Sequence, residues 1–341
     1  MFLSIVVCVY NEHDKIERCL KSILNQSFRD FEVIVVNDGS YDGSGAICDS
    51  YAKKDSRVKV VHRHNHGLAA SRKAALDICR GEYVGFVDSD DYADEKMFEK
   101  MCFSAKENNA DTVICGAVHH RGKTVQNIQG ARSFGVFDKK RLEAEIYPDM
   151  LSTKKFFEFG VTPTLWNKIF KREIIQCYFD VSDETVMGED VAAVYPCLLK
   201  SNRVVILKDE FLYHYTLSPD SMTMSYKKWF FGSNRCVYKT LRNACISEQF
   251  AVQIDRYVIY SSIVALKNEF SRENPRNFSE KLAGVIMYLL SDDVSRAFGN
   301  AKNYALPPYV RLLGKLIRKK KYVSLAFAIK FLNFVVNRKW V

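Results

Sequence analysis

The residues with the clearest potential for chemistry are carboxylates that follow an apolar run. Asp88, Asp90 and Asp91 come directly after residues 84–87, Val-Gly-Phe-Val. Carboxylates bind hard cations, and Mg²⁺ or Mn²⁺ needs only one or two of them when a diphosphate supplies further oxygens. Alternatively, these residues form a turn in which Asp91 or Asp94 caps the next helix. The spacing alone leaves both interpretations open.

Other chemistry-bearing residues follow further apolar runs. Tyr10 ends the first run and Asp38 follows the second, so adjacent loops would offer an aromatic face to a base and a carboxylate to the imide N–H of uracil. The alternatives are a packed aromatic ring and an ordinary turn residue. Glu189 and Asp190 open a helix-like stretch, where acidic residues often only complement the helix dipole.

These residues belong to a pattern of short apolar runs that alternate with helix-like stretches. Runs rich in β-branched residues are typical of parallel strands covered on both faces. The expected strands are Ser4–Val9, Phe31–Val36, Val58–Val61 and Tyr83–Val87, and the expected helices are Lys15–Asn25, Ser44–Lys53 and Leu68–Cys79. The pattern predicts a doubly wound α/β domain, in which ligands bind beyond the carboxyl ends of the strands.

Beyond residue 93 the pattern changes. We expect a helix near 94–108, strands at Thr112–Val118 and Trp166–Phe170, a short helix at Arg172–Cys177 and a hairpin at Arg203–Tyr215. From Lys227 the chain is helical in character, with breaks at 273–275 and 307–308. We therefore predict two domains, an α/β domain at 1–225 and a helical appendage at 226–341.

The positive charge is concentrated at the C-terminus. The formal net charge is +10, yet residues 294–341 hold eleven Lys and Arg and no Asp or Glu, so the other 293 residues sum to about −1. This distribution argues against a nucleic-acid-binding fold. The ten cysteines are scattered without a C-x-x-C pair, which indicates a reducing, cytosolic compartment. We identify neither a signal peptide nor a segment apolar enough to span a bilayer.

Taken in order, the motifs resemble those of family-2 glycosyltransferases with the GT-A fold. The matching segments are SIVVCVYNE at 4–12, LKSILNQSFRDFEVIVVNDGSYDGS at 20–44, NHGLAASRKAAL at 65–76, FVDSDD at 86–91, WNKIF at 166–170 and GED at 188–190. The resemblance covers about the first 225 residues. It implies a mostly parallel central sheet with flanking helices, a nucleotide-sugar donor such as a UDP-sugar, Mn²⁺ or Mg²⁺, and inverting transfer of a hexose or N-acetylhexosamine.

The resemblance also implies roles at the donor site. Tyr10 would stack on the uracil, Asp38 would accept from its ring, and Asp90 would bind the metal directly. The residues implied at the nucleotide and diphosphate are Cys8, Val9, Tyr10, Glu12, Asp38, Arg72, Asp88 and Ser89, and those implied at the metal are Asp90, Asp88 and His214. Without the resemblance, Arg72 would be interpreted as a surface arginine and His214 as an exposed hairpin histidine.

On the acceptor side, the resemblance makes Asp190 the base that deprotonates the attacking hydroxyl, with Glu189 as its neighbour. Trp166 and Lys168 match a segment that lines the acceptor pocket, although a tryptophan at a strand start is more often a core residue. Residues 221–223 match a loop that closes on the donor. The Q-x-x-R-W motif and membrane-spanning helices of processive synthases are absent from the sequence, which favours non-processive transfer.

The segment 311–339 allows two interpretations. An apolar stripe at helical spacing beside many lysines suits a helix that lies on an anionic membrane surface, or one that packs on protein. The stripe consists of Leu325, Ile329, Leu332 and Val336. We expect peripheral contact with the cytoplasmic face of the membrane, a glycan or lipid-linked acceptor and no nucleic acid. The alternative function is a catalytically silent, membrane-associated scaffold, and a homo-oligomer is compatible with either.

Overall fold

The computed structural model describes residues 1–217, 226–245, 247–301, 304–319, 321 and 323–329 of the 341-residue chain. They divide into two units. The first contains Met1–Pro148, Val161–Asp183 and Glu189–Pro219, and the second contains Asp149–Gly160, Glu184–Gly188 and Asp220–Val341. Two short segments that precede residue 225 therefore cluster with the helical part of the chain.

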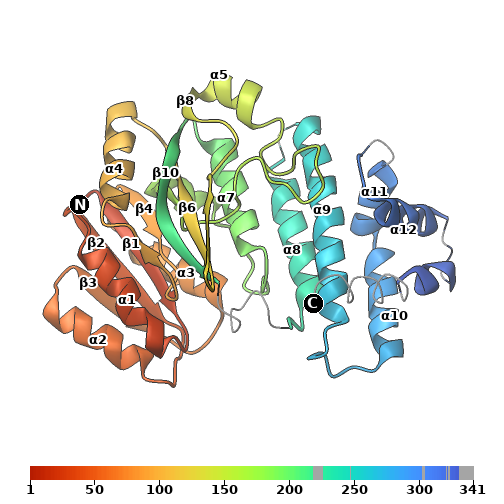
Figure 1. Ribbon diagram of the computed structural model, residues 1–341, viewed down its shortest axis with the longest axis horizontal. Helices are drawn as coiled ribbons and strands as arrows, with labels where there is room; N and C mark the ends of the chain where they lie inside the picture. Colours follow the sequence, from red (N-terminus) through yellow and green to blue (C-terminus); the bar gives the residue numbers. More distant parts are fainter. Residues whose placement is uncertain (218–225, 246, 302–303, 320, 322, 330–341) are drawn as a thin grey trace. The chain divides into compact units, whose positions relative to one another are not determined.

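The first unit is built on one mixed sheet (Figure 1). Its described strands are β1 (Leu3–Val9), β2 (Phe31–Asn37), β3 (Val58–His62), β4 (Tyr83–Phe86), β5 (Tyr92–Ala93), β6 (Thr112–Arg121), β7 (Thr124–Ile128), β8 (Gly135–Asp138), β9 (Lys168–Lys171) and β10 (Arg203–Leu217). They lie in the order β3-β2-β1-β4-β9-β6-β10-β5, with β7 beside β6 and β8 beside β10. The strands β3, β2, β1 and β4 are parallel, so their carboxyl ends share one edge of the sheet.

Helices cover this sheet because the side chains of its strands are apolar on both faces of the sheet. The helical elements of the unit are α1 (His13–Leu24), α2 (Ser44–Lys54), α3 (Leu68–Ile78), α4 (Met97–Asn108), α5 (Lys139–Arg141), η1 (Leu142–Ile146), α6 (Arg172–Tyr178) and α7 (Glu189–Lys200). Ile5 and Val7 of β1 pack in one core with Leu20 of α1 and Met101 of α4. The α/β prediction for this part of the chain is confirmed.

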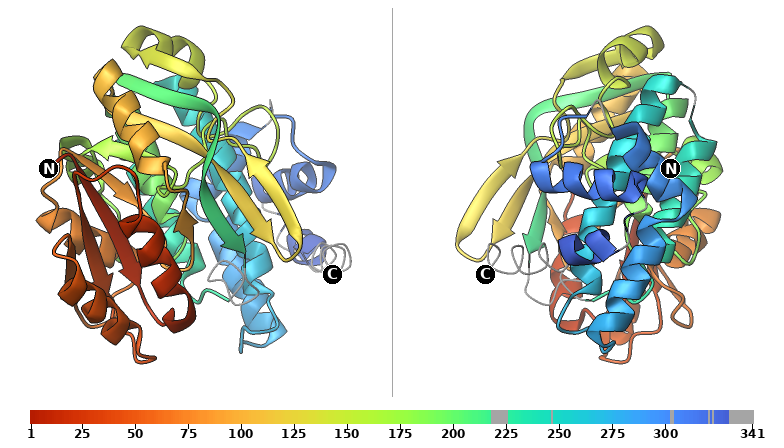
Figure 2. Two further views of the ribbon diagram at one scale, coloured as in Figure 1. Left: turned by 60° about the vertical axis from the view of Figure 1, so that its left-hand side comes forward. Right: turned by 90° about the vertical axis from the view of Figure 1, so that its right-hand side faces the viewer.

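The hairpin predicted at Arg203–Tyr215 is wrong. Strand β10 pairs in parallel with β6 as far as Leu217, and Figure 2 shows β6 and β7 extending beside its end. The register shifts between Ile206 and Phe211, and Asp209 has a φ of 57°. The polar run at 208–210 therefore forms a bulge within one strand, where its sequence suggested a turn.

The second unit is helical where it is described. Its helices are α8 (Phe230–Asn243), α9 (Glu248–Glu269), α10 (Phe278–Leu289), α11 (Asp292–Asn300) and α12 (Pro308–Arg318), and residues 323–329 are also helical. The caps agree with local sequence, since the Ser247 side chain accepts from the Phe250 N–H and Asn277 forms a capping box with Glu280.

The predicted C-terminal stripe is buried within this unit as far as it is described. Leu325 and Ile329 are 0% and 2% exposed, whereas Val323 and Phe327 are 72% and 69% exposed. Leu332 and Val336 lie outside the described residues. None of the described helices combines the length and the apolar character needed to cross a membrane.

Candidate active site

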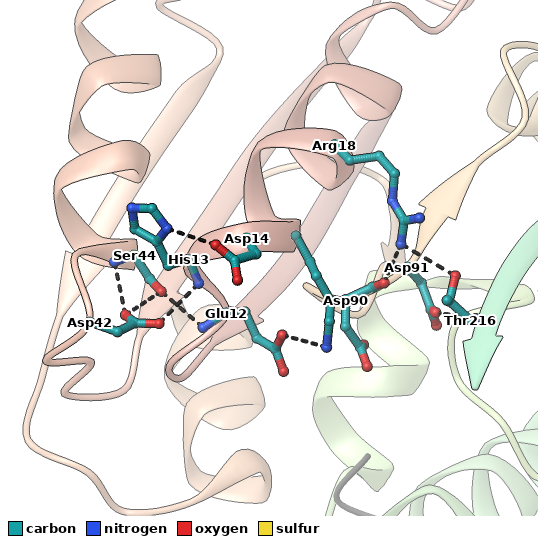
Figure 3. A network of polar contacts seen from close by, with 10 residues as sticks. Glu12, His13, Asp14, Arg18, Asp42, Ser44, Asp90, Asp91 and Thr216 are labelled. Carbon is teal, nitrogen blue, oxygen red and sulfur yellow. Dashed lines mark hydrogen bonds and ion pairs between the residues drawn. The ribbon is translucent and has the colours of Figure 1, made fainter. Parts of the chain in front are cut away.

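Two loops at the carboxyl ends of β1 and β2 are joined by hydrogen bonds (Figure 3). The Glu12 N–H donates to Ser44 Oγ at 2.9 Å, and the His13 N–H donates to Asp42 Oδ2 at 3.0 Å. The Glu12 carboxylate forms an ion pair of 3.0 Å with Lys15, and burial raises its pKa. These contacts fix the shape of both loops beside the strand ends.

The two loops present aromatic rings at this edge. Tyr10 is 44% exposed and lies edge to face against Tyr41, which is 83% exposed, with 6.3 Å between the ring centres. Beneath them, Val9 is buried and its carbonyl accepts from the Asp38 N–H at 2.9 Å. Burial raises the pKa of Cys8 to about 12, so its thiol is neutral. Tyr10 is thus placed where a base could stack, and Tyr41 is a second ring that the sequence analysis missed.

Asp38 is engaged by the backbone of the segment that leads into α3. Its carboxylate is buried and accepts the N–H groups of His66 at 3.1 Å and Gly67 at 2.8 Å. Arg63 Nε lies 3.4 Å from the same carboxylate. A structural role for Asp38 is therefore visible, whereas the predicted contact with uracil stays a prediction.

Arg72 joins three separate carboxylates. Its buried guanidinium donates from Nη1 to Asp190 Oδ1 at 2.5 Å and from Nη2 to Asp88 Oδ1 at 3.2 Å, and Nη1 lies 3.5 Å from Glu189 Oε1. It thereby connects α3, the end of β4 and the first turn of α7. The interpretation of Arg72 as a solvated surface residue is wrong, because its side chain is only 3% exposed.

One guanidinium does not balance three carboxylates at this point. Burial, together with the charges of Asp190 and Asp90, raises the pKa of Asp88 to about 6 against the opposing effect of Arg72. Burial and the Asp190 charge raise the pKa of Glu189 to about 7. The pKa of Arg72 is raised, because the neighbouring carboxylates outweigh its burial. The cluster is therefore a favourable place for a further positive charge.

Asp90 has a carboxylate that is available to a ligand. Arg18 donates to the Asp90 carbonyl at 2.6 Å, but the Asp90 side chain has no hydrogen-bond or ion-pair partner among the described residues (Figure 3). Asp88 and Asp90 would therefore fit a cation that takes its other oxygens from a diphosphate. Ser89, between them, is buried.

Asp91 differs from its neighbours and corrects the idea that it caps the next helix. It is buried, and its carboxylate accepts the Tyr213 hydroxyl at 2.8 Å and the Thr216 N–H at 2.7 Å. Burial and the charges of Asp88 and Asp90 raise its pKa to about 8. Asp91 thus anchors the acidic turn to β10.

His214 lies in an aromatic cluster. Its Nδ1 is 3.0 Å from Nε2 of His120, and its ring stacks on Tyr92 with 4.4 Å between centres. Burial and the neighbouring His120 lower its pKa. No group of three or more His, Cys, Asp or Glu side chains in the described part of the chain is placed to hold a metal ion. His214 was predicted to bind the metal together with Asp88 and Asp90, but in the structure its contacts are with His120 and Tyr92.

Trp166 and Lys168 are core residues. Trp166 is 6% exposed and stacks on Tyr213, with 4.3 Å between ring centres. Lys168 is 0% exposed, and its Nζ donates to the carbonyls of Thr162 and Thr164, each at 2.7 Å, and to Asn167 Oδ1 at 2.8 Å. The ammonium therefore holds a loop, and its burial corrects the prediction that it lines the acceptor pocket.

The loop that Lys168 holds contacts Asp190. The Leu165 N–H donates to Asp190 Oδ2 at 3.1 Å, while Arg72 binds Oδ1. Asp190 also lies in the first turn of α7, where the helix dipole favours a negative charge. Both carboxylate oxygens are thus oriented, and one carboxylate with fixed geometry is what general-base chemistry requires.

Comparisons with known proteins concern the chain as a whole. The model of the family described as Glycosyl transferase family 2 matches residues 4–179. The chain is 31% identical to the glycosyltransferase EpsH of Bacillus subtilis over an alignment of 296 residues. This alignment covers 83% of this chain and 81% of EpsH.

Solved structures show the same fold. The structure of S. aureus TarS 1–349 in complex with UDP-GlcNAc covers 97% of this chain and 91% of that chain, with a TM-score of 0.71 and 22% identity. The mannosyltransferase PcManGT of Pyrobaculum calidifontis, in complex with GDP-Man and Mn²⁺, covers 97% of this chain and 86% of that chain, with a TM-score of 0.51 and 15% identity.

Proposed function

The chain belongs to glycosyl transferase family 2, and we propose that it moves a hexose or N-acetylhexosamine from a UDP-sugar to a hydroxyl of a glycan or lipid-linked acceptor. The transfer is inverting and non-processive and takes place at the cytoplasmic face of the membrane. A nucleotide-sugar donor is supported by the TarS and PcManGT complexes, which contain UDP-GlcNAc and GDP-Man. In the predicted division into two domains, residues 1–225 carry the donor site and the catalytic base, and residues 226–341 form the helical appendage with the basic tail.

The observation that carries the proposal is the fixed geometry of Asp190. Its carboxylate takes the proton of the acceptor hydroxyl as the hydroxyl oxygen attacks the anomeric carbon. The bond between that carbon and the UDP oxygen breaks in the same step, and the bonding electron pair leaves with UDP. Attack opposite the leaving group inverts the configuration, with Arg72 and the Leu165 N–H holding the two oxygens of the base.

The donor side of the proposal rests on the loops at the strand ends. The exposed rings of Tyr10 and Tyr41 offer stacking surfaces to uracil. Asp90, with Asp88 behind it, would hold Mn²⁺ or Mg²⁺, which when bound offsets the negative charge of the departing diphosphate. Arg72 contacts both the base and Asp88, so Asp90 is the donor-side residue to test separately from the base.

The first experiment measures UDP release from a panel of nucleotide sugars with Mn²⁺ or Mg²⁺ and no acceptor. We expect slow, metal-dependent hydrolysis of one donor, and an inverted anomer of the released sugar in early ¹H NMR spectra. Asp90→Ala should abolish hydrolysis. Asp14→Asn is the matched control, because Asp14 is an exposed aspartate of α1, and it should change nothing.

Acceptor-dependent transfer separates the base from the donor site. Asp190→Asn should lower kcat by about 10²- to 10⁴-fold, the usual contribution of a general base, and leave metal-dependent UDP binding intact. Retention of configuration would contradict single displacement. A wild-type protein with neither hydrolysis nor metal-dependent UDP binding would instead support the silent scaffold.

A further inference from the structure

The second unit contains a wide cavity that is lined by none of the donor-site residues. Its volume is about 1240 Å³, and side chains of α8, α9 and α11 form most of its wall. Cavities for single small ligands are usually smaller, about 300–1,000 Å³. We propose that this cavity binds several units of an anionic, hydroxyl-rich chain, that is, a glycan or polyol chain bearing phosphate or carboxylate groups.

The floor of the cavity is a preorganised polar network. The buried Asp255 accepts from Arg242 Nη2 at 2.5 Å and from Asn300 Nδ2 at 2.8 Å. The Tyr238 hydroxyl accepts from Arg242 Nε at 2.9 Å and from Arg296 Nη2 at 2.5 Å. Two guanidinium groups are thus held in place with further N–H groups left to donate, which lowers the entropy lost when a ligand binds.

Stability alone does not account for this network. A buried ion pair is often no more stabilising than apolar residues of the same volume, because both charges must be desolvated. Here the pair of Arg242 and Asp255 borders an open cavity. Fixed arginines at such a place are typical of carboxylate and phosphate recognition.

The rim adds cations without an internal partner. Arg235 and Lys239 lie one turn apart on α8, both exposed, and neither has a hydrogen-bond or ion-pair partner among the described residues. The guanidinium of Arg256 lies 5.0 Å from the centre of the Tyr304 ring, which also lines the cavity. Cations beside an aromatic face suit a chain that has both charged groups and C–H surfaces.

The cavity lining carries five cations and four carboxylates, an excess of one positive charge. The second unit carries a net charge of +12, of which residues 302–341 supply +10, and the first unit carries a net charge of −2. This inference rests on the proposed function. In that function, the cavity would hold an acceptor or product chain while one end of that chain reacts.

The test measures binding of three soluble oligomers of equal length to the full chain. A glycerol-phosphate oligomer supplies phosphate groups, an oligogalacturonate supplies carboxylates, and a maltooligosaccharide supplies hydroxyls without charge. In 50 mM NaCl we expect at least one anionic oligomer to bind at least tenfold more tightly than the neutral one. The better anionic probe identifies which group the chain bears.

Two double variants locate the binding. The double variant Arg235→Glu with Lys239→Glu should weaken binding of the anionic oligomer at least tenfold. Arg311→Glu with Lys315→Glu on α12 makes the same charge change at the same helical spacing, outside the cavity, and should change binding less than twofold. Both variants should keep the wild-type Tm and donor hydrolysis.

Several results would overturn the inference: binding of no oligomer, equal binding of the neutral one, or equal weakening by both variants. Acceptor-free donor hydrolysis keeps the two proposals distinct. A wild-type protein with neither hydrolysis nor metal-dependent UDP binding contradicts the proposed function, while the binding measurements still decide the role of the cavity.

Discussion

Lys168 supports Asp190 through a loop without contacting it. In Lys168→Met the side chain keeps its length as far as the ε carbon but loses the ammonium, so the Thr162 and Thr164 carbonyls lose their donor. The loop that supplies the Leu165 N–H is then free to shift. Because small displacements of a catalytic group are costly, we expect kcat for transfer to fall roughly ten- to a hundredfold, with the donor KM changed less than twofold. Steady-state kinetics with both substrates varied measures this split.

The matched control is Lys171→Met on the same strand. Lys171 pairs with Asp111 at 2.9 Å, and its loss should lower stability without affecting kcat. Unsatisfied buried carbonyls should lower the free energy of unfolding of Lys168→Met by about 1–3 kcal/mol. If the two variants lost kcat to the same extent, Lys168 would have only a general structural role.

Glu189 should make stability depend on pH. Its pKa is raised to about 7 in the folded chain by burial and by Asp190, from an unfolded value of about 4.3. The folded state then holds the proton more tightly, so the stabilisation is present below about pH 4 and is lost as the pH rises toward about 7. Glu189→Gln should therefore be more stable than wild type at pH 8, by about 3–4 kcal/mol, and lose most of this advantage at pH 5. Chemical denaturation at both pH values tests the sign.

The identity of the site residues was easier to predict than their partners. Asp88 and Asp90 were considered as metal ligands because they follow an apolar run, whereas Asp190 was assigned as the base only through the family resemblance. No local pattern reveals that Arg72 joins Asp88, 16 residues away, to Asp190, 118 residues away. Lys168 shows the reverse problem, since a lysine is rarely buried unless its ammonium is fully hydrogen-bonded.

At the scale of elements, the loop at 162–167 depends on a glycine in the segment that sequence analysis left without a pattern. The Gly130 carbonyl accepts from the Thr162 N–H at 2.9 Å. A Cβ at Gly130 would lie 2.3 Å from the Cys115 carbonyl oxygen and 3.1 Å from Asn167 Nδ2. Gly130→Ala should therefore lower the free energy of unfolding by about 1–3 kcal/mol and reduce transfer activity.

Gly232→Ala is the opposite case and the control. A Cβ at Gly232, inside α8, meets no atom within 4 Å, and replacing a helical glycine by alanine stabilises a helix by up to about 1 kcal/mol. Thermal unfolding should show a lower Tm for Gly130→Ala and an equal or higher Tm for Gly232→Ala. A Tm loss confined to Gly232→Ala would contradict the packing argument.

Strands and helices with strong periodicity were predictable, and the exceptions have physical causes. The strands β1 to β4 and the helices between them agree with the predicted ranges within a few residues, because burial on both faces leaves uninterrupted apolar runs. The prediction of a hairpin at Arg203–Tyr215 is wrong because a bulge and a turn use the same polar residues. Only the tertiary pairing of β10 with β6 distinguishes them.

At the scale of the whole molecule, charge and chemistry belong to different units. The acidic cluster around Arg72 lies in a unit with a net charge of −2, and the unit with a net charge of +12 carries the cavity and α12. Sequence analysis located the basic tail but not its packing, because an amphipathic stripe has the same periodicity whether it faces lipid or protein. Leu325 and Ile329 are buried, and among the described residues of 311–329 the exposed apolar side chains are Leu312, Val323 and Phe327.

This separation predicts a separation of salt effects. Raising NaCl from 50 to 500 mM screens exposed charges, since the Debye length is already about 10 Å at 0.1 M. Binding to phosphatidylglycerol vesicles should weaken more than tenfold, whereas acceptor-free donor hydrolysis should change less than twofold. Arg311→Glu with Lys315→Glu should weaken vesicle binding, and the cavity variant Arg235→Glu with Lys239→Glu is the control that should retain it. A steep fall of hydrolysis with salt would contradict this division, because it would mean that exposed charge acts on the donor site itself.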